Sequence, residues 1–207
     1  MTLISLSSES PKMILASASS SRAKLLQAAG LSFEPIPANV DENSIKDSLK
    51  AENATAEQCA ETLAELKAVK ISQANADALV IGADQLLECN GDWFDKPADM
   101  NGVKSHLLKL RGQTHTLATS VVVAQNGARI WHFNASPQLS MRNFSDAFIE
   151  RYIAQVGEKA LLSVGAYQLE SEGIQLFSRI QGDFFAILGL PLLELLSFLR
   201  GHDVVQT

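Results

Sequence analysis

Hydrophobic residues near the start of the chain form a short run, which is followed by small polar residues and then by a helical pattern. Residues 13–16 are apolar and predict a short strand, and four of residues 17–21 are serines. Leu25, Leu26 and Ala29 then share one helical face, and Gly30 predicts the end of this helix. A strand, a turn of small residues and a helix direct backbone N–H groups and the helix dipole towards an anion. We therefore expect this turn to bind a triphosphate.

The next part of the chain predicts an edge strand, a long helix and a buried strand. Residues 31–37 (LSFEPIP) are strand-like, but their two prolines favour the edge of a sheet, and the polar residues 43–54 predict a loop or a broken helix. Thr55 and Gln58 have the spacing of a capping box, which predicts a helix to about Asn75. The continuous apolar run 78–83 (ALVIGA) predicts a strand that is buried on both faces and ends at Asp84.

Hairpin signals dominate the middle of the chain. Asn-Gly pairs at 90–91 and 126–127 predict tight turns, the second one between two strands within residues 115–133. Helices are predicted over about 101–110, after Ser145, and from Pro191 to Gly201. Residues 165–170 and 174–180 predict two further strands. The order of elements predicts an α/β or mixed α+β fold with a mixed sheet.

Length and composition restrict the class of protein. The chain has 207 residues, of which 46% are hydrophobic, so it is globular and long enough to bury a proper core. We expect one domain over residues 12–203 and a flexible leader over residues 1–11. The net charge of −6 argues against broad binding to nucleic acid or to a membrane surface. Two isolated cysteines, with no recognisable signal peptide and no membrane-spanning run, favour a cytoplasmic protein.

Polar residues at the ends of apolar elements predict a site that cleaves a phosphate bond. Cations and N–H donors neutralise phosphoryl oxygens, carboxylates hold Mg²⁺, and a further carboxylate orients or deprotonates a water molecule. We expect Asp84 to be this base and Glu42 to share the metal. The residues that contribute are the serine turn (Ser17, Ser19, Ser20 and Ser21), Arg22, the pair Asp41 and Glu42, Asp84, and the flanking Lys67 and Lys96.

Each of these residues also has an ordinary structural interpretation. The serine cluster is compatible with a plain helix N-cap, because neither a P-loop nor a dinucleotide-binding fingerprint is present. Asp41 and Glu42 are compatible with loop acids, and Lys67 with a solvated helix residue. Asp84 is harder to explain in this way, since burying an unpaired charge is costly. The histidines share no metal-ligand spacing, and no GxSxG motif surrounds Ser17.

Eight motifs in a fixed order give the chain a specific resemblance. It resembles the Maf family of nucleoside triphosphate pyrophosphatases, also described as septum-formation inhibitors. The motifs are LASASSSRAKLL (15–26), VDE (40–42), LAELKA (63–68), VIGADQ (80–85), DKP (95–97), LRGQTH (110–115), VGAYQLE (164–170) and GDFFAILGLP (182–191).

The resemblance implies a fold, a reaction and a set of site residues. The Maf/ITPase-like fold is an elongated mixed sheet flanked by helices, with two lobes around a cleft, and is commonly dimeric. The implied reaction is hydrolysis of a nucleoside triphosphate, natural or modified, to a monophosphate and pyrophosphate with a divalent cation, Mg²⁺ or Mn²⁺. Asp84 is the implied proton acceptor, and Glu42 and Asp84 are the implied metal ligands. The implied substrate-binding residues are Ser17, Ser19, Ser21, Arg22, Lys67, Gln85, Lys96 and Glu170.

Four positions depart from the usual pattern of the family. Ser20 and Ser21 stand where the family usually has proline and a first arginine, so one guanidinium fork is missing. Gln85 replaces a common threonine and Glu170 a common glutamine, which resembles the branch associated with 7-methyl-GTP rather than that of dTTP and UTP. A carboxylate can accept hydrogen bonds from the ring N–H and amino group of guanine.

The sequence leaves two other functions open. A nucleotide-binding regulator of cell division would bind the substrate without turnover, and the altered serine turn favours this alternative. An ordinary phosphatase would release orthophosphate instead of pyrophosphate.

Overall fold

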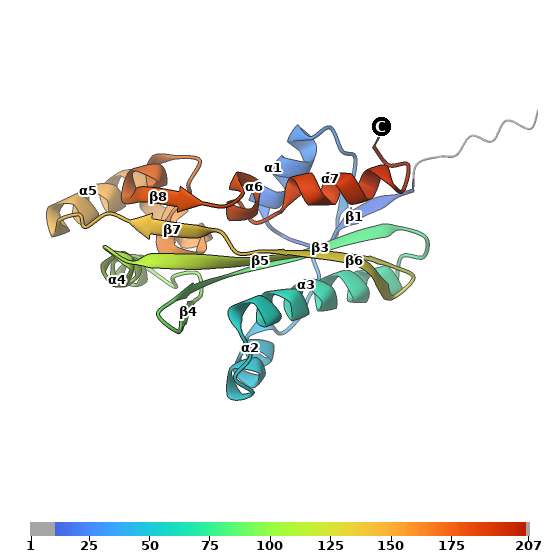
Figure 1. Cartoon of the computed structure of the whole chain (residues 1–207), viewed down its shortest axis with the longest axis horizontal. Helices are drawn as coiled ribbons and strands as arrows, with labels where there is room; N and C mark the ends of the chain where they lie inside the picture. The colour runs from blue at the N-terminus through green and yellow to red at the C-terminus, as the bar shows by residue number, and fades with distance from the viewer. Residues whose placement is uncertain (1–10, 206–207) are drawn as a thin grey trace, which may run out of the picture.

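Two long antiparallel strands, β3 (Leu79–Cys89) and β5 (Thr114–Gln125), run through the centre of the computed structural model, which describes residues 11–205 (Figure 1). They pair from Val80 with Ala124 to Glu88 with Thr116. Apart from half-buried Gln85 and Glu88, the residues of β3 are buried, because helices and loops cover both faces of the sheet (Figure 1). These two strands connect all other parts of the sheet.

The eight strands within residues 11–205 form one mixed sheet in the order β2-β1-β3-β5-β7-β8, with β4 on β3 and β6 on β5. Only β1 pairs in parallel, with β2 on one side and β3 on the other. The sheet therefore confirms the mixed architecture and the edge position predicted for residues 31–37. The remaining strands are β1 (Met13–Leu15), β2 (Glu34–Pro35), β4 (Asp92–Phe94), β6 (Ala128–Ala135), β7 (Gln138–Met141) and β8 (Phe177–Gln181).

Helices cover both faces of the sheet. In Figure 1, α3 lies below the sheet, α1 and α7 lie above it, and α4 and α5 lie at the opposite end. The α-helices are α1 (Ser20–Ala28), α2 (Glu42–Ala51), α3 (Ala56–Gln73), α4 (Met100–Leu110), α5 (Asp146–Val156), α6 (Phe184–Ile187) and α7 (Leu192–Arg200). Three 3₁₀ helices, η1 (Gly157–Leu162), η2 (Val164–Ala166) and η3 (Glu172–Leu176), follow α5.

The main hydrophobic cores define two lobes. One core joins α1, α7, β1 and the first half of β3, and the other joins α4, α5, β7 and the first part of β5. β5 changes its neighbour between the lobes, because its residues 114–116 pair with β7 and its residues 119–125 pair with β6. This arrangement confirms the elongated sheet with two lobes.

Helix α3 packs unusually close to β3. An ideal Cβ added to Gly82 would lie 2.2 Å from the backbone oxygen of Ala64 and 2.8 Å from the backbone nitrogen of Ala68. Only glycine fits this contact, and small alanines on the helix allow the approach. The contact fixes the distance between β3 and the turn of α3 that carries Lys67.

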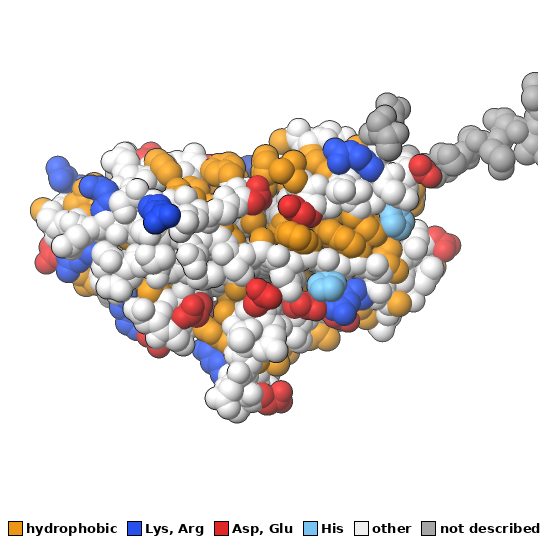
Figure 2. Space-filling model, viewed as in Figure 1, with side chains coloured by type: hydrophobic (Ala, Val, Ile, Leu, Met, Phe, Trp, Pro, Cys, Tyr) orange, Lys and Arg blue, Asp and Glu red, His pale blue; other side chains and the backbone are white. Residues whose placement is uncertain are grey.

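A row of polar contacts holds the outer side of α3 against β6. Glu61 accepts hydrogen bonds from Asn134 at 2.7 Å and from Arg129 at 2.7 Å, and Arg129 also pairs with Glu65 at 2.9 Å. Figure 2 shows acidic, basic and histidine side chains side by side along this edge. The row fixes the flank of α3 that lies next to its apolar contacts with the sheet.

Three predicted elements differ from the structure. Residues 42–51 form helix α2 rather than a loop, since the Asp41 side chain caps it and Ile45 and Leu49 pack against the cluster around α3. Strand β3 does not end at Asp84, because its backbone pairing with β5 continues to Glu88. Residues 165–170 do not form a strand and residues 174–176 belong to η3, so only the part from Phe177 onwards is extended.

The other helix and turn predictions are confirmed. Thr55 and Gln58 form the expected capping box of α3, and Ser145 caps α5. Both Asn-Gly pairs connect antiparallel strands. Within residues 11–205, no helix combines the length and hydrophobicity needed to cross a membrane. The leader predicted over residues 1–11 lies, except for Pro11, outside the described residues.

The close packing at Gly82 gives a prediction. We expect Gly82→Ala to lower the free energy of unfolding by about 3 kcal/mol, because the added methyl group must displace the backbone of α3. Urea unfolding measures this change. Gly201→Ala is the control, since a Cβ at Gly201 meets only one atom within 4 Å, at 3.3 Å. Equal unfolding midpoints for the wild type and Gly82→Ala would contradict the packing argument.

The contacts of Glu61 predict a pH-dependent contribution to stability. The hydrogen bond from Asn134 lowers the pKa of Glu61 below 4.5. Partial burial acts in the opposite direction, and the contacts with Arg129 and His132 lower the pKa further. A carboxyl whose pKa is lower in the folded state stabilises the fold above its unfolded pKa, and this contribution is lost as the pH falls through the folded pKa.

We therefore expect Glu61→Gln to lower the free energy of unfolding by about 1 kcal/mol at pH 7. The difference between wild type and variant should shrink as the pH falls below the ordinary glutamate pKa of 4.5. Urea titrations at several pH values measure it, with the exposed Glu158→Gln as control. A difference that grows towards acid pH would show that the assigned sign is wrong.

Candidate active site

A gap along one edge of β3 forms the centre of the candidate site. On this edge β1 pairs with residues 79–81 and β4 pairs with residues 87–89, and no described strand pairs with the stretch between them. Asp84 and Gln85 lie in this gap, and adjacent strand residues point to opposite faces of the sheet. Side chains from the helices on both faces of the sheet can therefore reach the site through this gap.

The gap is part of a pocket of about 680 Å³. Ten of the twelve residues predicted from the sequence for the site line this pocket, and Ser20 and Asp41 do not; the ten are Ser17, Ser19, Ser21, Arg22, Glu42, Lys67, Asp84, Gln85, Lys96 and Glu170. Arg22 and Asp84 thus share one cavity although 62 positions separate them (84 − 22). The fold thus brings residues from distant parts of the chain into one cavity.

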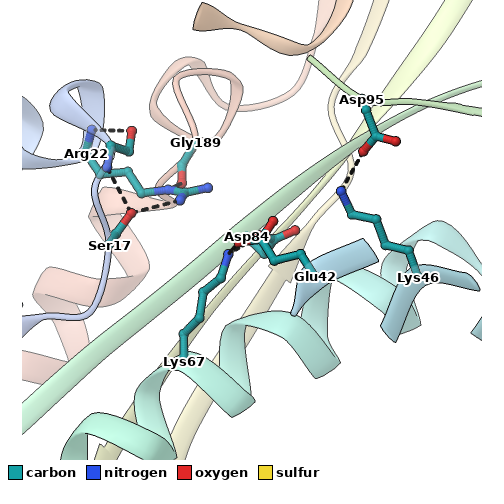
Figure 3. Close-up of polar contacts among 9 residues, drawn as sticks. Ser17, Arg22, Glu42, Lys46, Lys67, Asp84, Asp95 and Gly189 are labelled. Carbon is teal, nitrogen blue, oxygen red and sulfur yellow. Dashed lines mark hydrogen bonds and ion pairs between the residues drawn. The ribbon is translucent and has the colours of Figure 1, made fainter. Parts of the chain in front are cut away.

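A buried lysine joins two carboxylates at the centre of the pocket (Figure 3). The ammonium of Lys67 lies 2.5 Å from Asp84 Oδ1 and 2.7 Å from Glu42 Oε1. Lys67 is 7% exposed and Asp84 is 6% exposed, so Lys67 is not the solvated helix residue of the alternative interpretation. Buried ion pairs are costly to desolvate and seldom improve stability over apolar residues, so this cluster suggests a functional role.

The neighbouring cations favour the charged form of Glu42. Burial alone would raise the pKa of Glu42, but its hydrogen bond to Lys67 and the charges of Lys67, Lys46 and Arg22 outweigh this, so that its pKa is lowered. In Arg22, burial lowers the pKa of the guanidinium below its ordinary value, while the charges of Asp84 and Glu42 oppose the shift. These five side chains thus act on one another across the pocket.

The serine turn both caps a helix and positions Arg22. Ser19 accepts a hydrogen bond from the backbone N–H of Arg22 at 3.4 Å, as the N-cap interpretation predicted. In addition, Arg22 donates from Nε to the carbonyl of Gly189 at 2.8 Å and from Nη1 to Ser17 Oγ at 3.2 Å (Figure 3). The guanidinium is therefore held at the pocket wall by residues from both ends of the chain.

Gln85 is fixed on the opposite face of β3 from Asp84. Its side-chain nitrogen donates to Thr119 Oγ1 at 2.8 Å and to the carbonyls of Ala186 and Ile187 at 3.0 and 3.2 Å. Because two of these three partners are carbonyls, the orientation of the amide is determined. Its oxygen is then the acceptor that remains for a ligand.

Sequence reasoning missed one ion pair of the pocket. Lys46 on α2 lies 2.6 Å from Asp95, in the segment after β4, and both side chains line the pocket. Because residues 43–54 were expected to be a loop or a broken helix, Lys46 was not considered as a site residue. In the structure it lies one helical turn after Glu42 on the same face of α2. The i, i+4 spacing of an acid and a base would have indicated it.

Several residues considered from the sequence have structural roles. Asp41 caps α2 by accepting hydrogen bonds from Ser44, from N at 3.1 Å and from Oγ at 2.8 Å. His115 bonds through Nε2 to the hydroxyl of Tyr167 at 2.7 Å, and burial lowers its pKa to about 4. Cys59 and Cys89 are buried free thiols. None of these four residues lines the pocket.

For a divalent cation, the available protein donors are Glu42 and Asp84. Among residues 11–205, no three or more His, Cys, Asp and Glu side chains are arranged to hold a metal ion. Mg²⁺ keeps several waters and binds through one or two carboxylates plus substrate phosphates, so two carboxylates in one pocket fit it. The donor set thus suits a cation that arrives together with a phosphate ligand.

Comparisons with known proteins agree on one family. A model of the Maf-like protein family matches residues 12–202. A protein of Granulibacter bethesdensis named "Nucleoside triphosphate pyrophosphatase" is 54% identical, over 94% of this chain and 98% of its own. One of Paramagnetospirillum magneticum with the same name is 52% identical, over 90% and 96%. A "7-methyl-GTP pyrophosphatase" of Rhizobium meliloti is 48% identical, over 92% and 96%. With near-complete coverage of both chains and about half of the residues identical, this chain belongs to the Maf-like protein family.

Proposed function

We propose that this chain is a nucleoside triphosphate pyrophosphatase. The reaction would cleave the bond from the α-phosphorus to the bridging oxygen of the β-phosphate, with water adding to the α-phosphorus. The products would be a nucleoside monophosphate and pyrophosphate. The observation that carries this proposal is the Lys67 cluster, which places two carboxylates inside a pocket that also contains Arg22. The names of the relatives support it.

Asp84 is the group proposed to accept the proton of the attacking water. It lies in the gap of β3, reachable from the pocket, and a carboxylate there can both orient water and take its proton. Glu42 and Asp84 would hold the divalent cation, which would neutralise phosphate charge when bound. Lys67 compensates the charge of both carboxylates and holds them in place. Arg22, Lys96 and the serine turn would contact phosphoryl oxygens.

The side chains at the other face of β3 are proposed to recognise the base. The amide oxygen of Gln85 and the carboxylate of Glu170 line the same pocket, and both are hydrogen-bond acceptors. Guanine presents donors at its ring N–H and amino group, whereas thymine and uracil present one ring N–H. The two acceptors therefore favour guanine, and 7-methyl-GTP in particular is suggested by relatives with that name.

Removing the carboxylate of Asp84 tests the proposed base. We expect Asp84→Asn to reduce kcat by about 1000-fold, because an amide cannot accept the proton, while Lys67 keeps Glu42 as a partner and the fold survives. Pyrophosphate release with Mg²⁺ or Mn²⁺ against a panel of nucleoside triphosphates measures it. The control is Asp92→Asn, at an exposed acid of β4.

A folded Asp84→Asn variant with wild-type turnover would remove Asp84 from this role. The products identify the reaction class at the same time. Wild-type protein that binds nucleotides but releases nothing would be a binding regulator, and release of orthophosphate would indicate an ordinary phosphatase.

Exchanging the two acceptors tests base recognition. We expect the double variant Gln85→Thr/Glu170→Gln to lower the preference for 7-methyl-GTP over dTTP by roughly tenfold or more, measured as the ratio of kcat/KM values. The exposed Glu158→Gln serves as a control for removal of one negative charge. An unchanged ratio would assign base recognition to other residues of the pocket.

A further inference from the structure

Helix α2 contacts the rest of the molecule through one face that combines apolar and charged residues. None of its residues is buried, and its apolar contacts come from the half-buried Ile45 and Leu49. On the same face, Glu42 pairs with Lys67 and Lys46 pairs with Asp95, one helical turn apart (Figure 3). Both ion pairs lie in the pocket wall, so α2 brings one acid and one base to the site.

The four cations of the pocket differ in how firmly they are engaged. Lys67 is held between two carboxylates, and Arg22 is held by the Gly189 carbonyl and Ser17. Lys96 forms no ion pair within the described part of the chain. Lys46 lies between these extremes, with the single partner Asp95.

The ion pair between Lys46 and Asp95 is asymmetric. The side chain of Lys46 is 15% exposed, whereas that of Asp95 is 61% exposed. Burial opposes the charged form of Lys46, but the hydrogen bond and charge of Asp95, with Asp84 and Glu42, raise its pKa, so it stays an ammonium. An exposed carboxylate is a weak partner that water can replace, so a more strongly charged anion can take its position at little cost.

The arrangement of residues in the pocket indicates how a nucleotide would be oriented in it. Gln85 bonds to Ala186 and Ile187, and Arg22 bonds to Gly189, so the proposed base-binding Gln85 and Arg22 share one wall. In Figure 3, Asp84 lies between Arg22 and Lys46. A nucleotide with its base at Gln85 and its α-phosphorus at Asp84 would extend its remaining phosphates towards Lys46.

We propose that Lys46 binds the pyrophosphate half of the substrate by exchanging Asp95 for a phosphoryl oxygen. The inference rests on the proposed function, since it places the α-phosphorus at Asp84. Before substrate binds, Asp95 keeps the Lys46 ammonium in the pocket. Asp95 therefore competes with pyrophosphate for this ammonium.

The two members of the pair predict opposite effects on pyrophosphate binding. Lys46→Met removes the ammonium and retains the apolar stem, and we expect it to raise the dissociation constant for pyrophosphate by roughly 10- to 100-fold. Asp95→Asn removes the competitor, and we expect tighter binding by about two- to fivefold. Calorimetric titration of the full-length protein with pyrophosphate in the presence of Mg²⁺ measures both constants.

Matched controls separate charge from position. Lys50→Met removes the same charge from the same helix, at an exposed lysine that stands over the Trp93 ring outside the pocket, and it should leave pyrophosphate binding unchanged. Lys46→Met should also leave binding of a nucleoside monophosphate unchanged, since this product lacks the pyrophosphate half. Melting temperatures should shift by no more than about 3 °C, because the lost pair is partly exposed.

Several results would overturn the inference. Weaker pyrophosphate binding in both Lys46→Met and Asp95→Asn would show that the ion pair has a structural role, in which it holds α2 against the segment after β4. Equal loss of monophosphate binding in Lys46→Met would place Lys46 elsewhere along the nucleotide. If Lys46→Met binds pyrophosphate as tightly as the wild type does, and the wild-type protein hydrolyses nucleotides, this inference is refuted and the proposed function is not. Wild-type protein that binds pyrophosphate through Lys46 but hydrolyses no nucleotide would refute only the proposed function.

Discussion

The ammonium of Lys67 between Asp84 and Glu42 is the interaction on which the site depends. Two carboxylates from different elements, a central strand and the first turn of α2, meet only because a buried cation lies between them. Such a cluster contributes little to stability after desolvation, so its presence is better explained by chemistry than by folding. Contacts away from the pocket determine the geometry of the cluster. The close contact at Gly82 fixes the distance of α3 from β3, and the polar contacts with β6 fix the neighbouring flank of α3.

The architecture of the sheet explains why such a cluster is accessible at all. A central strand is normally paired along both edges, and its charged residues would be enclosed. Here β1 is short and β4 pairs only with the far end of β3, so the edge between them stays open at Asp84 and Gln85. Side chains on both faces of one strand can then contribute to one pocket, with charge compensation from α2 and α3 on one face and amide acceptors near α6 on the other.

The sequence predicted the parts of the fold that local chemistry determines. The capping box at Thr55, the Asn-Gly turns and the apolar run before Asp84 all specify their own conformation. Helix α2 was missed because its stability comes from contacts of Ile45 and Leu49 with a distant helix, and Lys46 was missed with it. Residues 165–170 were predicted to form a strand, but Gly165 and Ala166 adopt positive φ values of 75° and 63°, which end any extended structure. The ten site residues were identified from motifs, whereas the pairing of each cation with its carboxylate requires the three-dimensional structure.

Turnover in water enriched in ¹⁸O tests the central claim most directly, because the label marks the phosphorus that water attacks. If Asp84 directs water to the α-phosphorus, mass spectrometry will find one ¹⁸O atom in the nucleoside monophosphate and none in the pyrophosphate released. Label in pyrophosphate, or labelled orthophosphate as the product, would show that the carboxylate cluster around Lys67 faces a different bond.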